Sequence, residues 1–319
     1  MSRNIDRIEL RVEATRDLSP SLKHLRLVPA YGQGQLLAPA SAGSHIVLTL
    51  RDASRTFRNA YSLTSKPGAR DAYEIIVRRV QQSRGGSDFI HREIVPGTML
   101  EATPPANLFA PVRTARRHLL IAAGVGITPF LSYLPELDAL GQPFELHYCA
   151  RDDEQTCFAS WFGERPNARV YRDIEGHRLD VLALLRAQPV GTQLYVCGPD
   201  TLMDHVLASA RDLGWPASTL HAERFGGSRG GAAFVVSLAR SGFDVHVPGD
   251  VSLLDALEAA GVRADSQCRG GACGVCRTTV LDGCPEHRDY FLSAAERSEG
   301  RHIMPCVSRA AGERLVLDL

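Results

Sequence analysis

The stretch that decides the fold is Cys268-Arg269-Gly270-Gly271-Ala272-Cys273-Gly274-Val275-Cys276, in which three cysteines follow the spacing CxxxxCxxC. A fourth cysteine, Cys306, follows after 29 further residues. This spacing is typical of a plant-type [2Fe-2S] cluster. The glycines allow the sharp turns that bring three thiolates of one short loop around a small inorganic core. The sequence therefore predicts four cluster ligands, Cys268, Cys273, Cys276 and Cys306.

The same cysteines are also compatible with a structural zinc site or with buried thiols that merely pack. Zinc sites usually combine one CxxC with a second close pair, and Cys306 has no near cysteine neighbour. The cluster is therefore favoured over zinc, and zinc over simple packing. The remaining cysteines show no such spacing: Cys149, Cys157, Cys197 and Cys284.

The composition excludes several classes of protein. Among 319 residues, Lys plus Arg and Asp plus Glu both total 36, so the formal net charge is zero and no overall basic field attracts nucleic acid or a membrane. Eight cysteines are too few for a disulfide scaffold. The chain opens without an apolar signal core, and no apolar run approaches the length of a membrane span. We expect a cytoplasmic monomer of two or three domains.

Residues 1–112 are predicted to form a small antiparallel β-barrel. Closely spaced strands alternate with polar turns, which is typical of such barrels. The expected strands are Ile8 to Val12, Leu22 to Leu27, His45 to Leu50, Ala60 to Leu63 and Tyr73 to Val80.

Residues 113–225 are predicted to form an α/β domain. The apolar strand Leu119 to Ala123 passes through a glycine turn into a helix from Pro129 to Leu140. Strand and helix patterns then alternate, which indicates a parallel sheet covered on both faces. The later strands are Phe144 to Cys149, Ala168 to Tyr171, Leu194 to Cys197 and Leu220 to Ala222.

The glycine-rich residues 226–232 are predicted to be a flexible linker, because they offer nothing apolar to bury. Residues 233–319 form the third expected domain. A hairpin is predicted from Ala233 to Leu238 and Phe243 to Val247, followed by a helix from Ser252 to Ala260 that the Ser252 hydroxyl can cap. The cysteine loop follows this helix.

Two segments of the barrel offer a phosphate-binding site. The first is Arg58-Asn59-Ala60-Tyr61-Ser62-Leu63, and the second runs from the strand end Val77-Arg78-Arg79 to Arg84-Gly85-Gly86-Ser87. The latter precedes a helical stretch, Asp88 to Glu93, so its amides and the helix dipole can attract an anion that nearby arginines also bind. An ordinary strand and turn with solvated arginines would show the same residues.

Two loops of the α/β domain end strands and begin helices. In Ala122-Ala123-Gly124-Val125-Gly126-Ile127-Thr128-Pro129 the glycines permit close approach to a pyrophosphate, although the full GxGxxG is absent. The second loop is Cys197-Gly198-Pro199, where Pro199 is expected as the first helical residue. Both loops lie at carboxyl ends of strands, where ligands bind in open α/β sheets. Packing of Cys197 and helix capping by Thr128 are the structural alternatives.

Taken in order, these motifs resemble those of the phthalate dioxygenase reductase family. Arg58 to Leu63 resembles its flavin motif, Arg84 to Ser87 its flavin-phosphate loop, Ala122 to Pro129 its nicotinamide motif and Cys197 to Pro199 its CGP turn. The resemblance continues through Glu223-Arg224-Phe225, the cysteine loop, His287-Arg288-Asp289 and Met304 to Arg309. It spans nearly the whole chain. It implies a flavin barrel, a nicotinamide domain and a C-terminal ferredoxin domain of the β-grasp type.

The resemblance implies FMN, NADH and a [2Fe-2S] cluster as cofactors. Ser62 would hydrogen-bond the flavin ring near its reactive nitrogen, Tyr61 would pack on the ring, and Thr128 and Cys197 would line the nicotinamide side. Glu223 and Phe225 would lie against the flavin. Here Asn59 stands where the family's flavin motif usually has arginine. Arg58 through a local bulge, or Arg78, Arg79 or Arg84, is therefore expected to supply the phosphate charge.

The chemistry of these cofactors forms a sequence of electron transfers. Nicotinamide gives up a hydride, flavin accepts it and releases single electrons, and an iron-sulfur cluster carries one electron at a time. The resemblance implies delivery to the Rieske-type oxygenase component of an aromatic-ring dioxygenase or a demethylating monooxygenase. A reductase for a diiron oxygenase or a cytochrome, and a passive electron carrier, are the alternatives. His287 and Asp289 are expected to serve folding or a contact between domains.

The sequence also predicts a preference for NADH. The strand Ala168 to Tyr171 is followed by Arg172-Asp173, and a carboxylate at such a strand end accepts from the adenine ribose hydroxyls and repels a 2′-phosphate. Arg172 and Arg151 would act in the opposite direction.

Overall fold

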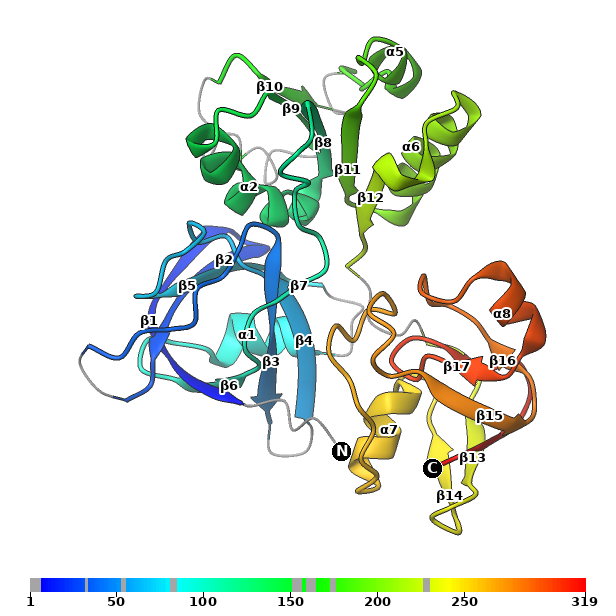
Figure 1. Ribbon diagram of the computed structural model, residues 1–319. Coiled ribbons are helices and arrows are strands. Elements are labelled where there is room, and N and C mark those ends of the chain that lie inside the picture. The colour runs from blue at the N-terminus through cyan, green and yellow to red at the C-terminus, as the bar shows by residue number, and fades with distance from the viewer. Residues whose placement is uncertain are drawn as a thin grey trace. The chain divides into compact units, whose positions relative to one another are not determined.

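The computed structural model describes residues 7–31, 34–52, 56–80, 85–150, 157–158, 165–172, 176–225 and 230–319. The chain divides into two compact units, one spanning Asp6–Phe225 and the other containing Gly226–Leu319. The first holds an antiparallel and a parallel sheet, and the second a mixed sheet (Figure 1). No helix in the described ranges has the length and apolar character needed to cross a bilayer.

The antiparallel sheet of the first unit is a nearly closed barrel. Its strands follow the order β4-β3-β6-β1-β2-β5, and a bridge between Leu63 and Ile75 joins the two ends of this order. Alternating apolar residues such as Ile46, Leu48 and Leu50 fill the interior. The elements are β1 Ile8–Ser19, β2 Leu22–Pro29, β3 Ser44–Arg51, β4 Thr56–Ser62, β5 Tyr73–Arg78, α1 Gly86–Glu93, β6 Met99–Ala102 and β7 Ala106–Asn107.

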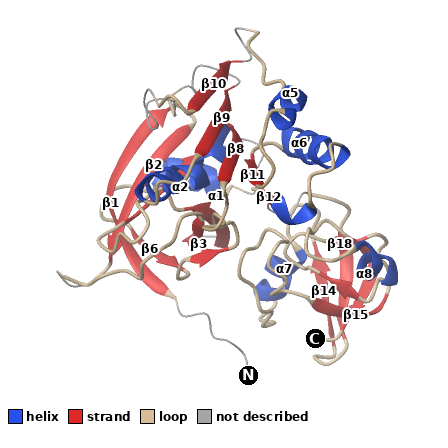
Figure 2. Ribbon diagram, turned by 45° about the horizontal axis from the view of Figure 1, so that its top comes forward, coloured by secondary structure: helices blue, strands red, loops and turns tan. Residues whose placement is uncertain are grey.

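The second sheet of this unit is parallel, in the order β10-β9-β8-β11-β12. Alternate residues of β8 face opposite layers: Leu120 packs with α2, and Leu119 and Ile121 pack with α5 and α6. Figure 2 shows these helices beside the strands. The elements are β8 Arg117–Ala123, η1 Gly124–Ile127, α2 Thr128–Ala139, β9 Phe144–Ala150, β10 Ala168–Arg172, α5 Val181–Arg186, β11 Thr192–Cys197, α6 Asp200–Asp212, η3 Ala217–Thr219 and β12 Leu220–Glu223.

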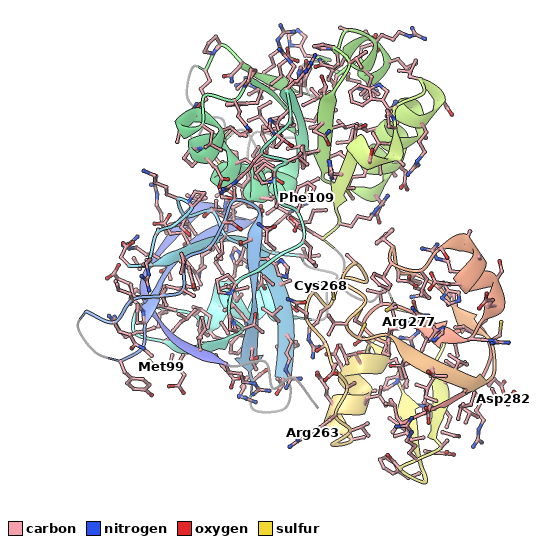
Figure 3. All side chains as sticks on the ribbon, in the orientation of Figure 1. Met99, Phe109, Arg263, Cys268, Arg277 and Asp282 are labelled. Carbon is pink, nitrogen blue, oxygen red and sulfur yellow. The ribbon has the colours of Figure 1, made fainter. Side chains whose placement is uncertain are left out.

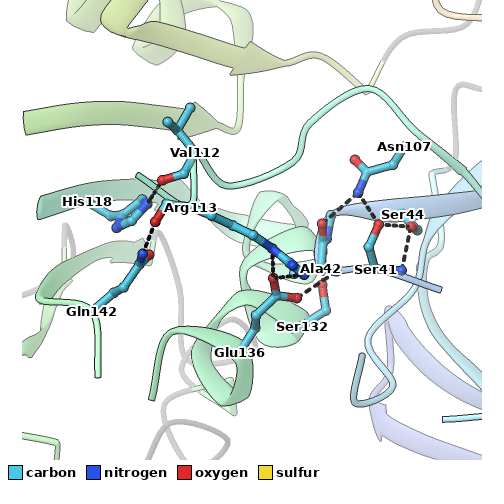
Figure 4. Close-up of polar contacts among 11 residues, drawn as sticks. Ser41, Ala42, Ser44, Asn107, Val112, Arg113, His118, Ser132, Glu136 and Gln142 are labelled. Atoms are coloured by element: carbon cyan, nitrogen blue, oxygen red, sulfur yellow. Dashed lines mark hydrogen bonds and ion pairs between the residues drawn. The ribbon is translucent and has the colours of Figure 1, made fainter. Parts of the chain in front are cut away.

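The two sheets of the first unit are joined by a polar and aromatic junction. The Gly43 amide donates to Ser132 Oγ at 3.0 Å, and the Ala42 amide to Glu136 Oε2 at 3.3 Å (Figure 4). The Tyr133 hydroxyl donates to the carbonyl of Phe109, a residue labelled in Figure 3. These contacts hold the barrel against α2, and one apolar cluster spans this junction beside the separate core inside the barrel.

The second unit contains a five-stranded sheet in the order β14-β13-β19-β15-β17, with β13 and β19 parallel and the other pairs antiparallel. Helix α7 packs its buried leucines on this sheet, the arrangement of a β-grasp domain. The Asp255 amide donates to Ser252 Oγ at 3.0 Å, which confirms the predicted cap. The elements are β13 Phe234–Leu238, β14 Phe243–Val247, α7 Leu253–Ala259, β15 Thr278–Asp282, β16 Pro285–Glu286, α8 Ala294–Glu299, β17 His302–Ile303, β18 Arg309–Ala310 and β19 Arg314–Leu317.

The predicted strands and helices are present, with corrected limits. The strand predicted from Ala60 is β4 and already begins at Thr56, and the strand predicted to end at Val12 continues to Ser19. Pro199 is the N-cap of α6 rather than its first residue, because its ψ of 143° is extended. The boundary predicted between residues 112 and 113 stays a prediction.

The C-terminal end of the predicted linker forms hydrogen bonds within the second unit. Residues 226–229 lie outside the described residues, but the Gly231 amide donates to the Gly249 carbonyl at 2.9 Å. The buried Arg309 guanidinium donates to the Ala232 carbonyl at 3.0 Å and to the Pro248 carbonyl at 2.9 Å. Gly231 is thus hydrogen-bonded within the second unit, by a contact that the local composition does not reveal, and the flexible linker stays a prediction.

Candidate functional site

Strand β4 and the parallel sheet meet at Ser62 and Glu223. Ser62 ends β4, Glu223 ends β12, and the Ser62 hydroxyl donates to Glu223 Oε2 at 3.3 Å. Glu223 is also the Cα partner of Cys197 at the end of β11. The structure thus brings together three residues that the resemblance places beside the flavin or the nicotinamide. They meet at the carboxyl edge of the parallel sheet, where ligands bind.

The two predicted glycine loops are in direct contact. A Cβ atom on Gly126 would lie 2.4 Å from the Cys197 carbonyl oxygen, and one on Gly198 would lie 3.1 Å from the Ala123 Cβ. Strands β8 and β11 pair side by side, with Ala122 opposite Cys197, so their loops leave the sheet together. Gly124 has a φ of 55°, in the left-handed region. These glycines therefore let two backbones approach each other at the edge of the sheet.

Thr128 and Cys197 are buried at this edge, at 2% and 1% exposure. The Thr128 hydroxyl donates to the Val125 carbonyl at 2.9 Å, and Pro129 follows in the first turn of α2. Burial raises the pKa of the Cys197 thiol, and the nearby Glu223 carboxylate raises it further. Cys197 is therefore a neutral thiol, and this geometry gives it no role as a nucleophile.

The proposed flavin-phosphate loop opens α1. Gly85 precedes the helix with a φ of 105°, and a Cβ atom on Gly86 would lie 2.5 Å from Asn59 Nδ2. Asn59 Nδ2 in turn donates to the Tyr61 hydroxyl at 3.1 Å. The buried Ser87 hydroxyl accepts from the Val80 amide at 3.1 Å. Strand β4 and the N-terminus of α1, which are distant in sequence, thus lie together. The side chain of Asn59 packs against the first turn of α1.

The arginines differ in their relation to this site. Pairing of β3 with β4 is continuous from Arg51 opposite Thr56 to His45 opposite Ser62. Strand β4 therefore has no bulge at Arg58, which was one of the alternatives expected for the phosphate charge. Without a bulge, Arg58 lies on the face of β4 opposite to Asn59. Arg79 forms an ion pair with Asp88 at 2.7 Å, and Arg78 is exposed at the end of β5, which also carries the buried Val77.

Six further residues were predicted to contact the flavin or the nicotinamide, and the structure describes three of them. Arg84, Arg151 and Asp173 lie outside the described residues. Phe225 follows β12 and is 46% exposed. Ala60 is exposed on β4, and Leu63 is buried at the bridge to Ile75.

The four predicted ligand cysteines form two thiol pairs. The sulfur atoms of Cys276 and Cys306 are 3.3 Å apart, and the thiols of Cys268 and Cys273 are hydrogen-bonded. Cys268, Cys276 and Cys306 are buried, and Cys273 is partly exposed. In the described ranges no three His, Cys, Asp or Glu side chains converge on a single metal ion. Two pairs fit the two irons of a [2Fe-2S] core better than one tetrahedral zinc.

Hydrogen bonds between the cysteines lower the pKa of one thiol in each pair, Cys268 and Cys276, and raise the pKa of its partner, Cys273 or Cys306. A hydrogen bond with Cys273 lowers the pKa of Cys268, and the amides of Gly270, Ala272 and Cys273 lower it further. The Gly270 amide lies 3.4 Å from Cys268 Sγ. A hydrogen bond with Cys306 likewise lowers the pKa of Cys276. Because thiolates are the ligands of iron, the amides that favour them also favour cluster binding.

Arg269, which was not among the predicted site residues, anchors this loop. Arg269 has a φ of +50°, rare for a residue with a side chain, and its side chain is 8% exposed. Its guanidinium forms ion pairs with Asp255, at 2.8 Å, and Glu258 of α7. The presence of a charged residue between the first cysteine and the glycines was the available signal.

Asp289 holds the neighbouring segment. Its buried carboxylate accepts from the Leu292 amide at 2.8 Å and from the Ser308 hydroxyl at 3.3 Å, and His287 Nδ1 lies 3.6 Å from it. The Tyr290 amide donates to the Gly271 carbonyl at 2.9 Å. These contacts support the expected folding role for Asp289.

Comparisons with known proteins match this geometry. Residues 236–311 match the family model of the 2Fe-2S iron-sulfur cluster binding domain. Residues 98–220 match the N-terminal domain of dimethylamine monooxygenase subunit DmmA-like proteins. The solved structure of phthalate dioxygenase reductase, a modular structure for electron transfer from pyridine nucleotides to [2Fe-2S], superposes with a TM-score of 0.84 and 33% identity over 98% of both chains.

Two curated relatives are similar along nearly the whole chain. The heme-dependent oxidative N-demethylase beta subunit of Ectopseudomonas mendocina (strain ymp) is 42% identical over 98% of this chain and 99% of its own length. The phthalate 4,5-dioxygenase oxygenase reductase subunit of Pseudomonas putida is 38% identical over 97% of this chain and 96% of its own length. A flavin, NAD(P)H and a [2Fe-2S] cluster are the redox groups of this architecture. The chain therefore belongs to the phthalate dioxygenase reductase family, and it is an oxidoreductase of the class that forms the reductase subunits of Rieske oxygenase systems.

Proposed function

We propose that this protein passes electrons from NADH through FMN and the [2Fe-2S] cluster to the Rieske-type oxygenase component of a multicomponent oxygenase. The observation that carries the proposal is the convergence of Ser62, Cys197 and Glu223 at the sheet edge, in a chain that also carries two thiol pairs. The three residues at the sheet edge are suited to hydride transfer between the nicotinamide and flavin rings. The four cysteines are suited to a cluster that carries one electron at a time. We also propose that the protein is cytoplasmic, since NADH is available there, and that it is a monomer.

Within this proposal the residues hold and orient the cofactors. Amides of Gly85, Gly86 and Ser87 at the start of α1 would bind the FMN phosphate, with Asn59 beside them. Because Arg79 is paired with Asp88, we assign the phosphate mainly to amide donors. Tyr61 and Ser62 would meet the flavin ring, and Gly124 and Gly126 would allow the nicotinamide cofactor to approach.

The identity of the flavin is tested by releasing it from the purified protein with acid and separating it by chromatography. FMN is the expected product. FAD would contradict the assignment of a terminal phosphate to the α1 N-terminus. The choice of NADH is tested by comparing kcat/KM for NADH and NADPH, and a higher value for NADPH would contradict it.

A second acceptor has specific support. A relative named as the beta subunit of a heme-dependent oxidative N-demethylase is 42% identical to this chain, and the DmmA-like match covers residues 98–220. A haem-dependent oxygenase is therefore the competing partner. The test combines the purified reductase and NADH with a Rieske oxygenase component and, separately, with a haem-dependent N-demethylase component. Product formed only with the Rieske component supports the proposal, and product formed only with the haem component contradicts it.

A further inference from the structure

The buried residue His45 lies opposite Ser62, whose hydroxyl donates to Glu223. His45 of β3 is the Cα partner of Ser62 of β4, and cross-strand partners project from the same face of a sheet. The Leu63 amide donates to the Ser44 carbonyl at 2.8 Å. Ser44 and Leu63 are therefore a hydrogen-bonded pair of the two strands. The next pair, His45 and Ser62, is a non-hydrogen-bonded pair, in which opposite side chains approach most closely. The imidazole therefore lies on the face of β3 and β4 that carries Ser62, the donor to Glu223.

The hydrogen-bonding capacity of this imidazole is not used within the chain. His45 is 5% exposed, and neither of its ring nitrogens has a hydrogen-bond partner among the described residues. Its second strand neighbour, Ala106 of β7, carries no polar side-chain atom. Burial lowers the pKa of His45 to about 4, so the ring is neutral, with one donor and one acceptor nitrogen. Buried polar groups are paired in the great majority of cases, so a partner from outside the chain is expected.

We propose that His45 is a flavin-contact residue, whose neutral imidazole hydrogen-bonds the isoalloxazine ring on the side that Ser62 meets. The inference rests on the proposed placement of the flavin at Tyr61 and Ser62. The pyrimidine part of the flavin ring carries carbonyl acceptors and an N–H donor, so either tautomer of His45 finds a complementary group there. His45 thereby adds a third polar group to Ser62 and Glu223, and it orients the ring rather than transferring a proton.

The test compares His45→Leu and His45→Gln in the full chain, each with and without flavin. In the flavin-free protein, His45→Leu should melt at the same or a higher temperature, because it removes two unpaired buried nitrogens. The same variant should bind flavin about 10-fold more weakly, the loss expected for one hydrogen bond, and should shift the visible flavin band. His45→Gln retains a donor and an acceptor, and should bind flavin with intermediate affinity and a shifted band.

The control is Thr49→Val, on the same face of β3 and opposite Arg58. It should leave the flavin dissociation constant unchanged. Wild-type affinity and spectrum in both His45 variants would overturn the inference, and would leave water as the partner of the ring. A raised KM for NADH with unchanged flavin affinity would also overturn it, in favour of nicotinamide. An unsubstituted chain that holds no flavin would overturn the proposed function itself, so the two failures are distinguishable.

Discussion

At the scale of single residues, the glycine at position 126 is explained by close contact between two backbones as well as by the nicotinamide motif. Gly126 was expected to make room for a pyrophosphate, but the neighbouring loop already restricts this position, with the Cys197 carbonyl oxygen 2.4 Å from the place of a Cβ atom. Gly126 therefore serves the fold, and in the proposed function it also lets the nicotinamide cofactor approach. The sequence alone shows the glycine at position 126, but it does not show that the Cys197 carbonyl leaves no room for a side chain there.

A Gly126→Ala substitution tests this contact. Because the clash is with backbone, the two strand ends must separate, at a cost of about 2 kcal/mol in the free energy of unfolding. The melting temperature should fall and the KM for NADH should rise, while the flavin content stays unchanged. Gly312→Ala is the control, since no atom lies within 4 Å of its added Cβ and its φ is ordinary. A Gly126→Ala protein with wild-type melting temperature and KM would show that the loops are not constrained here.

At the scale of elements, the strands and helices were predictable and their contacts were not. The alternation of apolar residues in β3 and the strand-turn-helix of β8 and α2 are local patterns. The regular pairing that turns Arg58 away from Asn59, and the ion pairs that tie Arg269 to α7, depend on partners distant in sequence. His45 could not be identified for the same reason, because a strand pattern does not show whether a polar side chain has a partner.

The pairing of Arg269 with α7 gives a prediction at this scale. Arg269→Ala leaves Asp255 and Glu258 without their partner near the cluster loop, and loss of one member of a buried ion pair costs about 3 kcal/mol. The variant should lose iron and its cluster absorption faster than the wild type during incubation. Arg240→Ala removes an exposed pair with Asp318 in the same domain and should have almost no effect. Equal rates of iron loss in both variants would refute a role for Arg269 as an anchor.

At the scale of the whole molecule, the division into two units indicates that the flavin and nicotinamide parts keep their own core without the cluster. Cys273→Ser should therefore lose the cluster, while reduction by NADH of a dye that takes electrons from flavin stays near its original rate. Electron delivery to the oxygenase should collapse. Dye reduction and oxygenase turnover would be measured on the same preparation, together with bound iron. An iron-free variant that still drives its oxygenase at normal speed would show that the cluster is not on the path.

The complete path from NADH through the flavin to the cluster is tested most directly by titrating the purified protein with NADH in the absence of oxygen. Flavin takes two electrons and the cluster one, so about 1.5 NADH per chain should bleach both the flavin and the cluster absorption, and the reduced cluster should give an electron paramagnetic resonance signal. Reduction that stops at the flavin, or a protein whose spectrum NADH does not change, would contradict the account.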